Sequence, residues 1–390
     1  MFRPQKSGPS RNRRLILAWG APRSLMHRMS SRPELRAQTS LRGIAALTVF
    51  IAHAEFYRLF PQAPLFQKIY NVFFWHNVAV DLFFELSGFI LCYVYLSKPF
   101  TWTQYAMARF SRIYPLYLAG IAAYLVMNTA AWIKTGVLSQ GLTFGTLFTN
   151  LFLVQCWPLL PTFTSINQPT WSISVEVFLY LFLFPILCLS QRHVSPRLKM
   201  ALVVLPVTLL ACIYLFGDPM LRLGGAPLSP YRGILCFTSG FFMCTLGLAS
   251  GFAGIPKKIE FGVLLVMLGC LLFQFPLNRS YAVLGFPFLA YFTADALSLS
   301  TRLLDIPLLC WLGDLSYSIY VWHYPMIKAV TLALGLRTVG QSENLQTPPS
   351  TAHSLLYMAV LVIAVLTISH LSHFYFERPV AKWLRRGRKP

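Results

Sequence analysis

Long apolar stretches with few charges recur along the whole chain, and they constrain its fold more than any other feature. A bilayer core needs about 20 mainly apolar residues per helix, within a range of about 17 to 25. Eleven stretches come close to that requirement: 41–57, 78–97, 113–133, 144–160, 172–190, 200–216, 232–250, 259–275, 281–298, 316–336 and 353–376. With 56% hydrophobic and 12% charged residues, the composition excludes an ordinary soluble enzyme and a disordered basic protein. The sequence predicts an all-α fold, a polytopic bundle of membrane helices.

The basic residues gather at the two ends of the chain. There are 33 Lys and Arg against 12 Asp and Glu, which gives a formal charge of +21. Ten basic residues lie from Arg3 to Arg42 and six from Arg378 to Lys389. Basic tails beside apolar spans are typical of the cytoplasmic face of a membrane. Nucleic-acid binding would need a folded basic surface or a known module, and the sequence offers neither, so the expected partner is the lipid bilayer.

The distribution of basic loops tests the number of crossings. If both basic ends are cytoplasmic, the chain crosses the membrane an even number of times. Excluding 144–160, which Gly145 interrupts and Pro158 and Pro161 follow, brings four basic loops to the cytoplasmic side. These loops contain Lys98 with Arg109 and Arg112, Arg192 with Arg197 and Lys199, Lys257 with Lys258, and Arg302. We therefore predict about ten transmembrane helices, with 134–171 as an external or re-entrant excursion.

Three regions follow from this pattern. Residues 1–37 are expected to be a basic cytoplasmic tail without fixed structure, 38–377 a membrane domain, and 378–390 a second basic cytoplasmic tail. The first 40 residues lack the uninterrupted apolar core of a signal peptide. Being rich in Arg and poor in acids, they loosely resemble an organelle transit peptide, and Met26 or Met29 are alternative starts.

Polar residues inside the spans are the best functional candidates, because a charge at mid-bilayer costs about 2.5 to 3.5 kcal/mol on insertion scales. In the first span, Arg42 and His53 are eleven residues apart, so a helix places them on one face about 16 Å apart. Arg42 would lie at the cytoplasmic boundary, where it can hold phosphate, and His53 near half depth. The alternative is a snorkelling Arg and a histidine satisfied by a neighbouring helix.

The second span contains two acids, Asp81 and Glu85, one helical turn apart. Asp81 would lie near the outer surface and Glu85 about 6 Å deeper, with Ser87 and Gly88 just below. Two acids within a span are hard to explain as packing, although Asp81 could simply be exposed. Gly88 would permit close approach of another helix.

Paired arginines open the third span. Arg109 and Arg112 share one helix face at the predicted cytoplasmic boundary. They could bind phosphate, or they could be ordinary positively charged anchors.

Two further spans carry a polar face. Ser172, Glu176 and Tyr180 align at intervals of four residues in a helix that enters from the outside. An isolated buried carboxylate such as that of Glu176 is rarely structural. Ser316, Tyr320 and His323 lie along one face of a later span, where a polar seam between helices is the alternative.

No metal site is expected. Two histidines alone, His370 and His373, do not make a metal site, so we assign them to packing. The eight cysteines lie in apolar stretches without a CxxC pair, which is typical of small membrane-core residues.

Six motifs together resemble a known family. LRGIAALTVFIAH, DLFFELSGFIL, RFSRIYPLYL, QPTWSISVEVFLY, LGDLSYSIYVWHYP and FYFERP, in that order, are similar to the successive signatures of the acyltransferase-3 family of bacterial membrane O-acyltransferases. The resemblance covers about residues 38 to 384. Members of this family modify lipopolysaccharide, exopolysaccharide and related glycans. One departure is Glu85, an acid where many members have an aromatic or apolar residue.

The resemblance implies roles for particular residues. Arg42 and His53 would be essential, with His53 as the catalytic base, and Arg109 and Arg112 would be the paired arginines at the cytoplasmic mouth. Glu176 and the motif from Ser316 to His323 would belong to the active site. Acyl-CoA, by default acetyl-CoA, would be the donor co-substrate.

The resemblance also suggests a direction of transfer. Cations at the inner mouth and acids toward the outer side describe an asymmetric passage, with the acceptor approaching from the side of Asp81, Glu85, Ser172, Ser316, Tyr320 and His323. Glu176 could orient His53 or hold the acceptor. The acceptor would be a glycan or a lipid-linked sugar of the cell envelope, and the location the bacterial inner membrane with both termini cytoplasmic.

Two other classes of protein share such residues. A transporter or channel also places acids, histidines and arginines on facing helices, but its two halves often correspond, and no second copy of the Arg42–His53 motif occurs. A membrane sensor that binds an acylated ligand without turnover is the third alternative.

Overall fold

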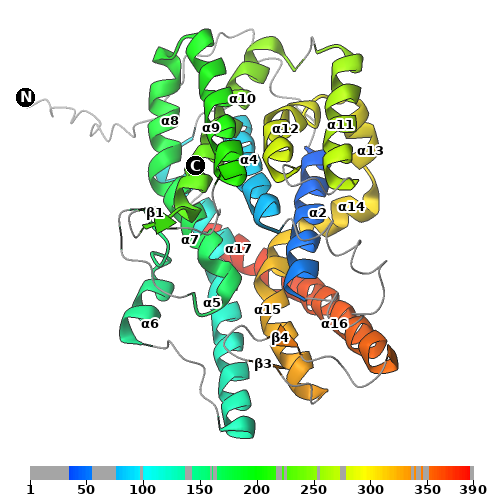
Figure 1. Ribbon diagram of the computed structural model, residues 1–390. Coiled ribbons are helices and arrows are strands. Elements are labelled where there is room, and N and C mark those ends of the chain that lie inside the picture. Colours follow the sequence, from blue (N-terminus) through cyan, green and yellow to red (C-terminus); the bar gives the residue numbers. More distant parts are fainter. Residues whose placement is uncertain are drawn as a thin grey trace, which may run out of the picture.

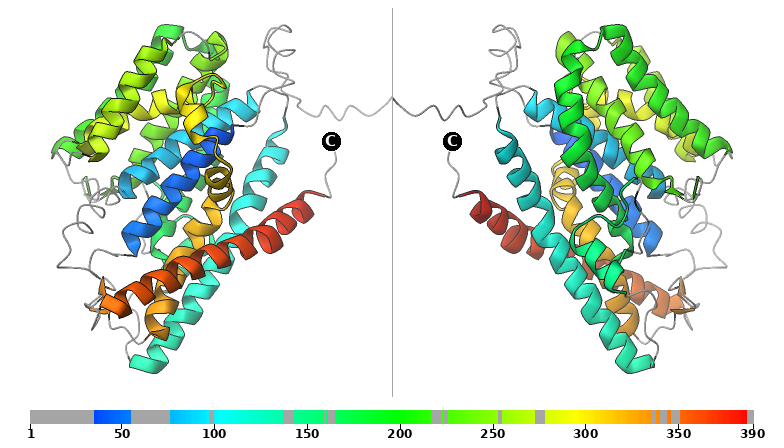
Figure 2. Two further views of the ribbon diagram at one scale, coloured as in Figure 1. Left: turned by 90° about the vertical axis from the view of Figure 1, so that its right-hand side faces the viewer. Right: turned by 90° about the vertical axis from the view of Figure 1, so that its left-hand side faces the viewer.

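A computed structural model gives the arrangement of the chain (Figures 1 and 2). It describes residues 35–54, 76–96, 100–136, 143–158, 160, 165–216, 222–223, 226–252, 255–272, 278–334, 338–339, 344–345 and 351–386. The predicted N-terminal tail lies almost wholly outside these ranges. Residues 55–57, 97, 273–275 and 335–336, predicted as the ends of four spans, also lie outside them.

Helices account for most of the described residues. The α-helices are α2 (Arg36–His53), α4 (His76–Tyr95), α5 (Trp102–Thr135), α6 (Phe144–Leu151), α7 (Trp171–Phe178), α8 (Phe184–Ser190), α9 (Pro196–Phe216), α10 (Ser229–Ser250), α11 (Lys257–Leu272), α12 (Asn278–Phe292), α13 (Leu299–Leu304), α14 (Pro307–Asp314), α15 (Ser316–Ala333), α16 (Thr351–Ser372) and α17 (Arg378–Arg385). Two 3-10 turns are η2 (Gln168–Thr170) and η4 (Gln191–His193), and two π-helical segments are η3 (Leu179–Leu183) and η5 (His373–Glu377). Two-residue strands form two antiparallel pairs, β1 (Arg222–Leu223) with β2 (Ala226–Pro227) and β3 (Thr338–Val339) with β4 (Asn344–Leu345).

Six of the described helical segments are long and apolar enough to cross a membrane. They are Asn77–Tyr95, Trp102–Lys134, Gln168–His193, Pro196–Phe216, Ser229–Ser250 and Ala352–Arg385. The other predicted crossings correspond to α2, α11, α12 and α15, which are shorter or more polar over their described lengths. The chain is thus a helical integral membrane protein, and the count of ten remains a prediction.

The segment at 144–160 does not form a spanning helix, as predicted. Its helix α6 has only eight residues, about 12 Å of rise, and turns follow it. The third span differs from its prediction, because α5 begins at Trp102 rather than near 113. Thr101 and Gln104 form a capping box that starts the helix there. Arg109 and Arg112 therefore lie two to three turns inside α5 and not at its start.

The most extensive contact between described helices is that of α4 with α10. A Cβ built at Gly240 would lie 2.1 Å from the carbonyl oxygen of Glu85, and one built at Gly88 would lie 2.1 Å from that of Phe237. Only glycine allows two backbones so close. The prediction that Gly88 permits close helix approach is therefore confirmed.

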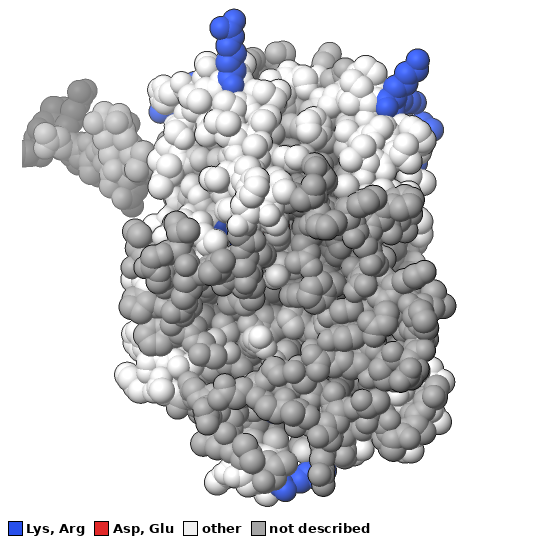
Figure 3. Space-filling view, viewed as in Figure 1, with Lys and Arg blue, Asp and Glu red and all other residues white. Residues whose placement is uncertain are grey.

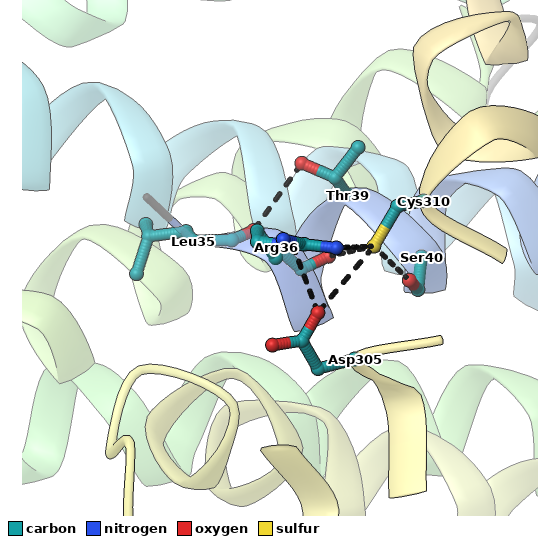
Figure 4. Close-up of polar contacts among 6 residues, drawn as sticks. All are labelled: Leu35, Arg36, Thr39, Ser40, Asp305 and Cys310. Atoms are coloured by element: carbon teal, nitrogen blue, oxygen red, sulfur yellow. Dashed lines mark hydrogen bonds and ion pairs between the residues drawn. The ribbon is translucent and has the colours of Figure 1, made fainter. Parts of the chain in front are cut away.

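The start of α2, the helix that carries Arg42 and His53, is fixed against α13 and α14. Gly43 and Gly313 meet at a close crossing, where a Cβ on Gly43 would lie 2.6 Å from the amide nitrogen of Gly313. Figure 4 shows the polar contacts beside this crossing. The Nε of Arg36 lies 2.8 Å from Oδ1 of Asp305, and the Cys310 sulfur lies 3.3 Å from Oγ of Ser40.

Two of the predicted basic loops share one end of the molecule. The α8–α9 and α10–α11 connections both lie at the upper end in Figure 1, and Lys and Arg side chains project there in Figure 3. Their exposed basic residues include Arg192, Arg197, Lys257 and Lys258. The C-terminal end of α5, which leads into the predicted external excursion, lies at the opposite end (Figure 1). This separation agrees with the loop assignment made from the sequence.

The second predicted tail is helical over its described part. Helix α17 continues α16 through η5 and packs against α5. In Figure 2 the α16–η5–α17 rod crosses α5 obliquely. Residues 378–386 therefore pack on the helix bundle.

Candidate active site

A cavity of about 520 Å³ opens where α2, α5, α14 and α17 meet. The three arginines singled out in the sequence, Arg42, Arg109 and Arg112, line it together. Its walls also contain residues that the sequence analysis did not select, namely Asp314, His373, Glu377, Arg378, Lys382 and Arg385. We call this space the basic cavity, because six of its lining side chains are Lys or Arg. Its size falls within the range of ligand-binding pockets, about 300–1,000 Å³.

Tyrosine rings hold Arg109 in place. Its guanidinium carbon lies 5.7 Å from the ring centre of Tyr95 and 5.8 Å from that of Tyr180, which are cation–π distances. The Arg109 Nε is buried and has no hydrogen-bond partner among the described residues. The rings orient the guanidinium while leaving donor capacity for a ligand.

The segment η5 supplies a histidine–carboxylate pair at the cavity wall. The His373 Nδ1 lies 3.0 Å from Oε2 of Glu377, which also accepts a hydrogen bond of 2.9 Å from Ser318. The His373 ring is buried, and its Nε2 has no hydrogen-bond partner within the described part of the chain. The sequence analysis assigned His373 to packing, whereas its ring stands at the wall of the basic cavity. The acid four residues on, within the FYFERP motif, was the signal that could have identified it.

A second, smaller pocket of about 50 Å³ lies deeper in the bundle, between α2, α4, α7 and α15. Arg42 lines this inner pocket as well as the basic cavity. Glu176 faces it, and its Oε1 accepts hydrogen bonds from Ser87, at 3.2 Å, and from the hydroxyl of Tyr180. Tyr180 lies in the π-helical segment η3. The two π-helical segments of the described chain, η3 and η5, thus both supply side chains to the candidate active site. Such segments are frequent at functional sites.

The predicted polar seam on α15 meets α7 at the inner pocket. The Tyr320 hydroxyl donates to the Pro169 carbonyl at 2.8 Å and lies 2.6 Å from Oγ of Ser172. Ser316 also lines the pocket, and its buried hydroxyl has no hydrogen-bond partner among the described residues. The structure therefore brings Ser172, Glu176, Ser316 and Tyr320 together around one space.

His53 lies beside His323, and neither histidine is among the residues that line the inner pocket. The two imidazole ring centres are 5.2 Å apart, and the His323 ring centre lies 5.8 Å from that of Tyr320. The Nδ1 of His53 lies 2.9 Å from the carbonyl oxygen of Val49. A carbonyl can only accept, so Nδ1 donates and Nε2 is the nitrogen that can take a proton. The hydrogen bonds of Glu176 described here go to Ser87 and Tyr180.

The two acids of α4 are buried within the helix bundle. Asp81 forms an ion pair with Arg232 of α10, 2.8 Å between Oδ1 and a guanidinium nitrogen, and both side chains are 0% exposed. Tyr214 of α9 donates a further hydrogen bond to Asp81. The sequence analysis missed Arg232, although an arginine within an apolar helix signals a buried acidic partner. Glu85 accepts a hydrogen bond of 3.1 Å from Ser239, also on α10.

Comparison with known proteins identifies the chain. The sequence profile of an acyltransferase domain, acyltransferase-3, matches residues 39–372. The chain belongs to the acyltransferase-3 family. It is therefore an acyltransferase, and the transporter and sensor alternatives are set aside. The six ordered motifs predicted this family correctly.

Individual relatives of this acyltransferase share about a quarter of its residues. Acyltransferase MdmB of Streptomyces mycarofaciens is 27% identical over 91% of this chain and 93% of its own length. Exopolysaccharide production protein ExoZ of Rhizobium meliloti is 26% identical over 80% and 90%. Peptidoglycan O-acetyltransferase OatA of Listeria monocytogenes is 24% identical over 78% of this chain, which spans only 51% of the OatA length. The search of solved structures gives no match.

The described residues of this family member contain no group of three or more His, Cys, Asp or Glu placed to hold a metal ion. All eight cysteines are free thiols.

Proposed function

We propose that this membrane O-acyltransferase moves an acetyl group from acetyl-CoA to a hydroxyl group of a cell-envelope glycan. The single observation that carries the proposal is that Arg42 lines both the basic cavity and the inner pocket. A donor with phosphates at one end and a thin neutral arm at the other would suit the basic cavity and the inner pocket, because both spaces border Arg42. Arg42, Arg109 and Arg112 would bind the donor's phosphates.

The size of the inner pocket favours a short acyl group. At about 50 Å³ it is roughly a tenth of the volume of the basic cavity, and Phe83, Phe84 and Tyr320 are among the side chains that enclose it. A long acyl chain would have to displace these rings, and forcing extra methylenes into a packed interior typically costs about 1–3 kcal/mol.

The chemical step is a direct transfer with His53 as general base. The acceptor hydroxyl attacks the thioester carbonyl, the new C–O bond forms, and the C–S bond breaks. Nε2 of His53 takes the hydroxyl proton and returns it to the departing thiolate, so protons balance. The Val49 carbonyl supports this role because it fixes the tautomer in which Nε2 is unprotonated. Glu176, which faces the inner pocket, would bind the acceptor's hydroxyl groups.

The proposed acceptor is a polysaccharide or a lipid-linked sugar. The names of two relatives, an exopolysaccharide production protein and a peptidoglycan O-acetyltransferase, support a glycan. The acceptor would contact Ser172, Ser316 and Tyr320, which line the inner pocket, and not Asp81 and Glu85, which are buried against α10. In this proposal the enzyme sits in the bacterial inner membrane with both termini in the cytoplasm, so that the basic cavity meets cytoplasmic acetyl-CoA.

Purified protein in lipid nanodiscs tests the base. We expect His53→Ala to lower the rate of acetyl transfer from acetyl-CoA by about 10²–10⁴-fold, the usual contribution of a general base. His193→Ala, which removes an exposed imidazole outside the site, is the matched control and should retain full rate. Full CoA-dependent transfer by His53→Ala would rule out this mechanism.

Mass spectrometry of envelope glycans tests the acceptor. Strains with and without the gene should differ by one acetyl group on one glycan class. Complementation of the deletion strain with the His53→Ala gene should leave the glycan mass at the value of the deletion strain. Identical glycan masses in both strains, together with acetylation of a small molecule, would contradict the glycan acceptor.

A further inference from the structure

We propose that the basic face of α17 is a binding subsite for the 3′-phosphate of the donor's nucleotide, which lets the enzyme select coenzyme A thioesters. The inference rests on the proposed acyl-CoA donor and deepens it. The subsite consists of Arg378, Lys382 and Arg385, with His373 beside it. No role was assigned to α17 from the sequence, where it was predicted to be a tail.

One face of α17 points into the cavity. Arg378, Lys382 and Arg385 stand at i, i+4 and i+7, so they form one stripe, and Ala381 between them also lines the cavity. Arg386, the next residue along the chain, does not line it. The remaining cations of the cavity come from α2 and α5.

Two residues that line this space carry polar nitrogens without partners. The buried Arg109 Nε and His373 Nε2 both lack hydrogen-bond partners among the described residues. Burying a polar group without a partner is unfavourable, so a bound ligand that forms hydrogen bonds with them would satisfy them. Glu377 accepts a hydrogen bond from the other ring nitrogen of His373, so Nε2 points away from Glu377 and is the ring nitrogen that accepts, whereas the Nε of Arg109 donates.

The charges of the cavity match those of the whole donor. Six cations and the acids Asp314 and Glu377 line it, which leaves four positive charges in formal terms. A phosphate monoester carries about −1.5 to −2, so a diphosphate linkage together with a 3′-phosphate carries about −4. Arg42, Arg109 and Arg112 alone would leave part of that charge uncompensated.

The position of Arg42 indicates that the diphosphate binds the arginines of α2 and α5 and that the 3′-phosphate binds α17. Arg42 reaches the inner pocket, where the thioester arm ends, whereas no residue of α17 lines that pocket. In coenzyme A the diphosphate lies on the side of the arm and the 3′-phosphate on the far ribose. The diphosphate therefore fits Arg42, Arg109 and Arg112, and the far phosphate fits α17, where Lys382 and Arg385 are exposed at the cavity mouth.

Competition between two ligands tests the subsite. The affinities of coenzyme A and 3′-dephospho-coenzyme A are measured on the full chain in nanodiscs by displacement of radiolabelled acetyl-CoA. Wild type should bind coenzyme A about tenfold more tightly, as expected for charged hydrogen bonds at a partly exposed site. Lys382→Gln with Arg385→Gln should lose this preference, with unchanged affinity for the dephospho form.

Two control variants separate loss of the subsite from a general loss of binding. Arg386→Gln removes a neighbouring charge and should keep the preference, whereas Arg112→Gln should weaken both ligands alike. The ratio of affinities within one sample is insensitive to the fraction of folded protein. Equal affinities in wild type, or equal weakening of both ligands by the α17 variant, would overturn the subsite alone. A wild type that binds neither ligand would instead overturn the proposed donor.

Discussion

The buried ion pair between Asp81 and Arg232 allows a quantitative prediction. Arg232 is fully enclosed and donates to Asp81 at 2.8 Å, to Tyr214 at 2.8 Å and to the Asn77 carbonyl at 2.9 Å. Asp81→Leu leaves this guanidinium without its counter-charge, and Arg232→Met leaves the carboxylate without one. Removing one partner of a buried pair costs about 3–5 kcal/mol. We expect each single variant to lose that much free energy of unfolding.

The double variant makes the prediction sharp. With both charges gone, the Tyr214 hydroxyl is the group that loses its partners in this cluster, which costs about 1–3 kcal/mol. The two changes should therefore be non-additive by about 3 kcal/mol or more. Reversible unfolding in mixed micelles, followed by tryptophan fluorescence, gives the four free energies. If the double variant lost the sum of the two single losses, the pair would not be coupled and the reasoning would be refuted.

Three further predictions concern packing and hydrogen bonding. Gly240→Ala should destabilise the protein by about 1–3 kcal/mol, because its Cβ would meet the α4 backbone at 2.1 Å. Gly262→Ala, whose Cβ would meet no other atom within 4 Å, should be neutral or slightly stabilising. Equal melting temperatures for the two variants would contradict this. Glu260→Ala should cost about 1–2 kcal/mol, since its carboxylate accepts from two amides at the start of α13, and Glu260→Gln should recover part of the loss in the same melting assay. Tyr320→Phe, which removes the hydroxyl beside Ser172, should slow acetyl transfer more than it lowers stability, and an unchanged rate would place Tyr320 outside the reaction.

Features that depend on the local sequence could be predicted well. The helical fold, the exclusion of 144–160 as a span and the close approach at Gly88 follow from hydrophobicity, proline and glycine alone. The family followed from the order of six motifs, which is far more specific than any one of them.

Features that depend on contacts between distant segments could not. Asp81 and Arg232 are 151 residues apart, and only the packing of α4 on α10 brings them together. Helix α17 was predicted to be a basic tail, because its own sequence gives no sign of the cavity that α5 and α14 form beside it. The start of α5 was placed too late because hydrophobicity locates the bilayer and not the capping box at Thr101.

Arg42 also bears on how tightly the membrane stays sealed. An enzyme with polar spaces reaching inward from both faces risks leaking protons, and a fixed positive charge at the narrowest point repels them, as arginines do in water channels. Arg42 stands where the basic cavity meets the inner pocket, so it would serve as an electrostatic barrier. Proteoliposomes that contain Arg42→Gln should then dissipate an imposed pH gradient faster than those with the wild type. Arg42 would then serve the integrity of the membrane as well as the proposed chemistry.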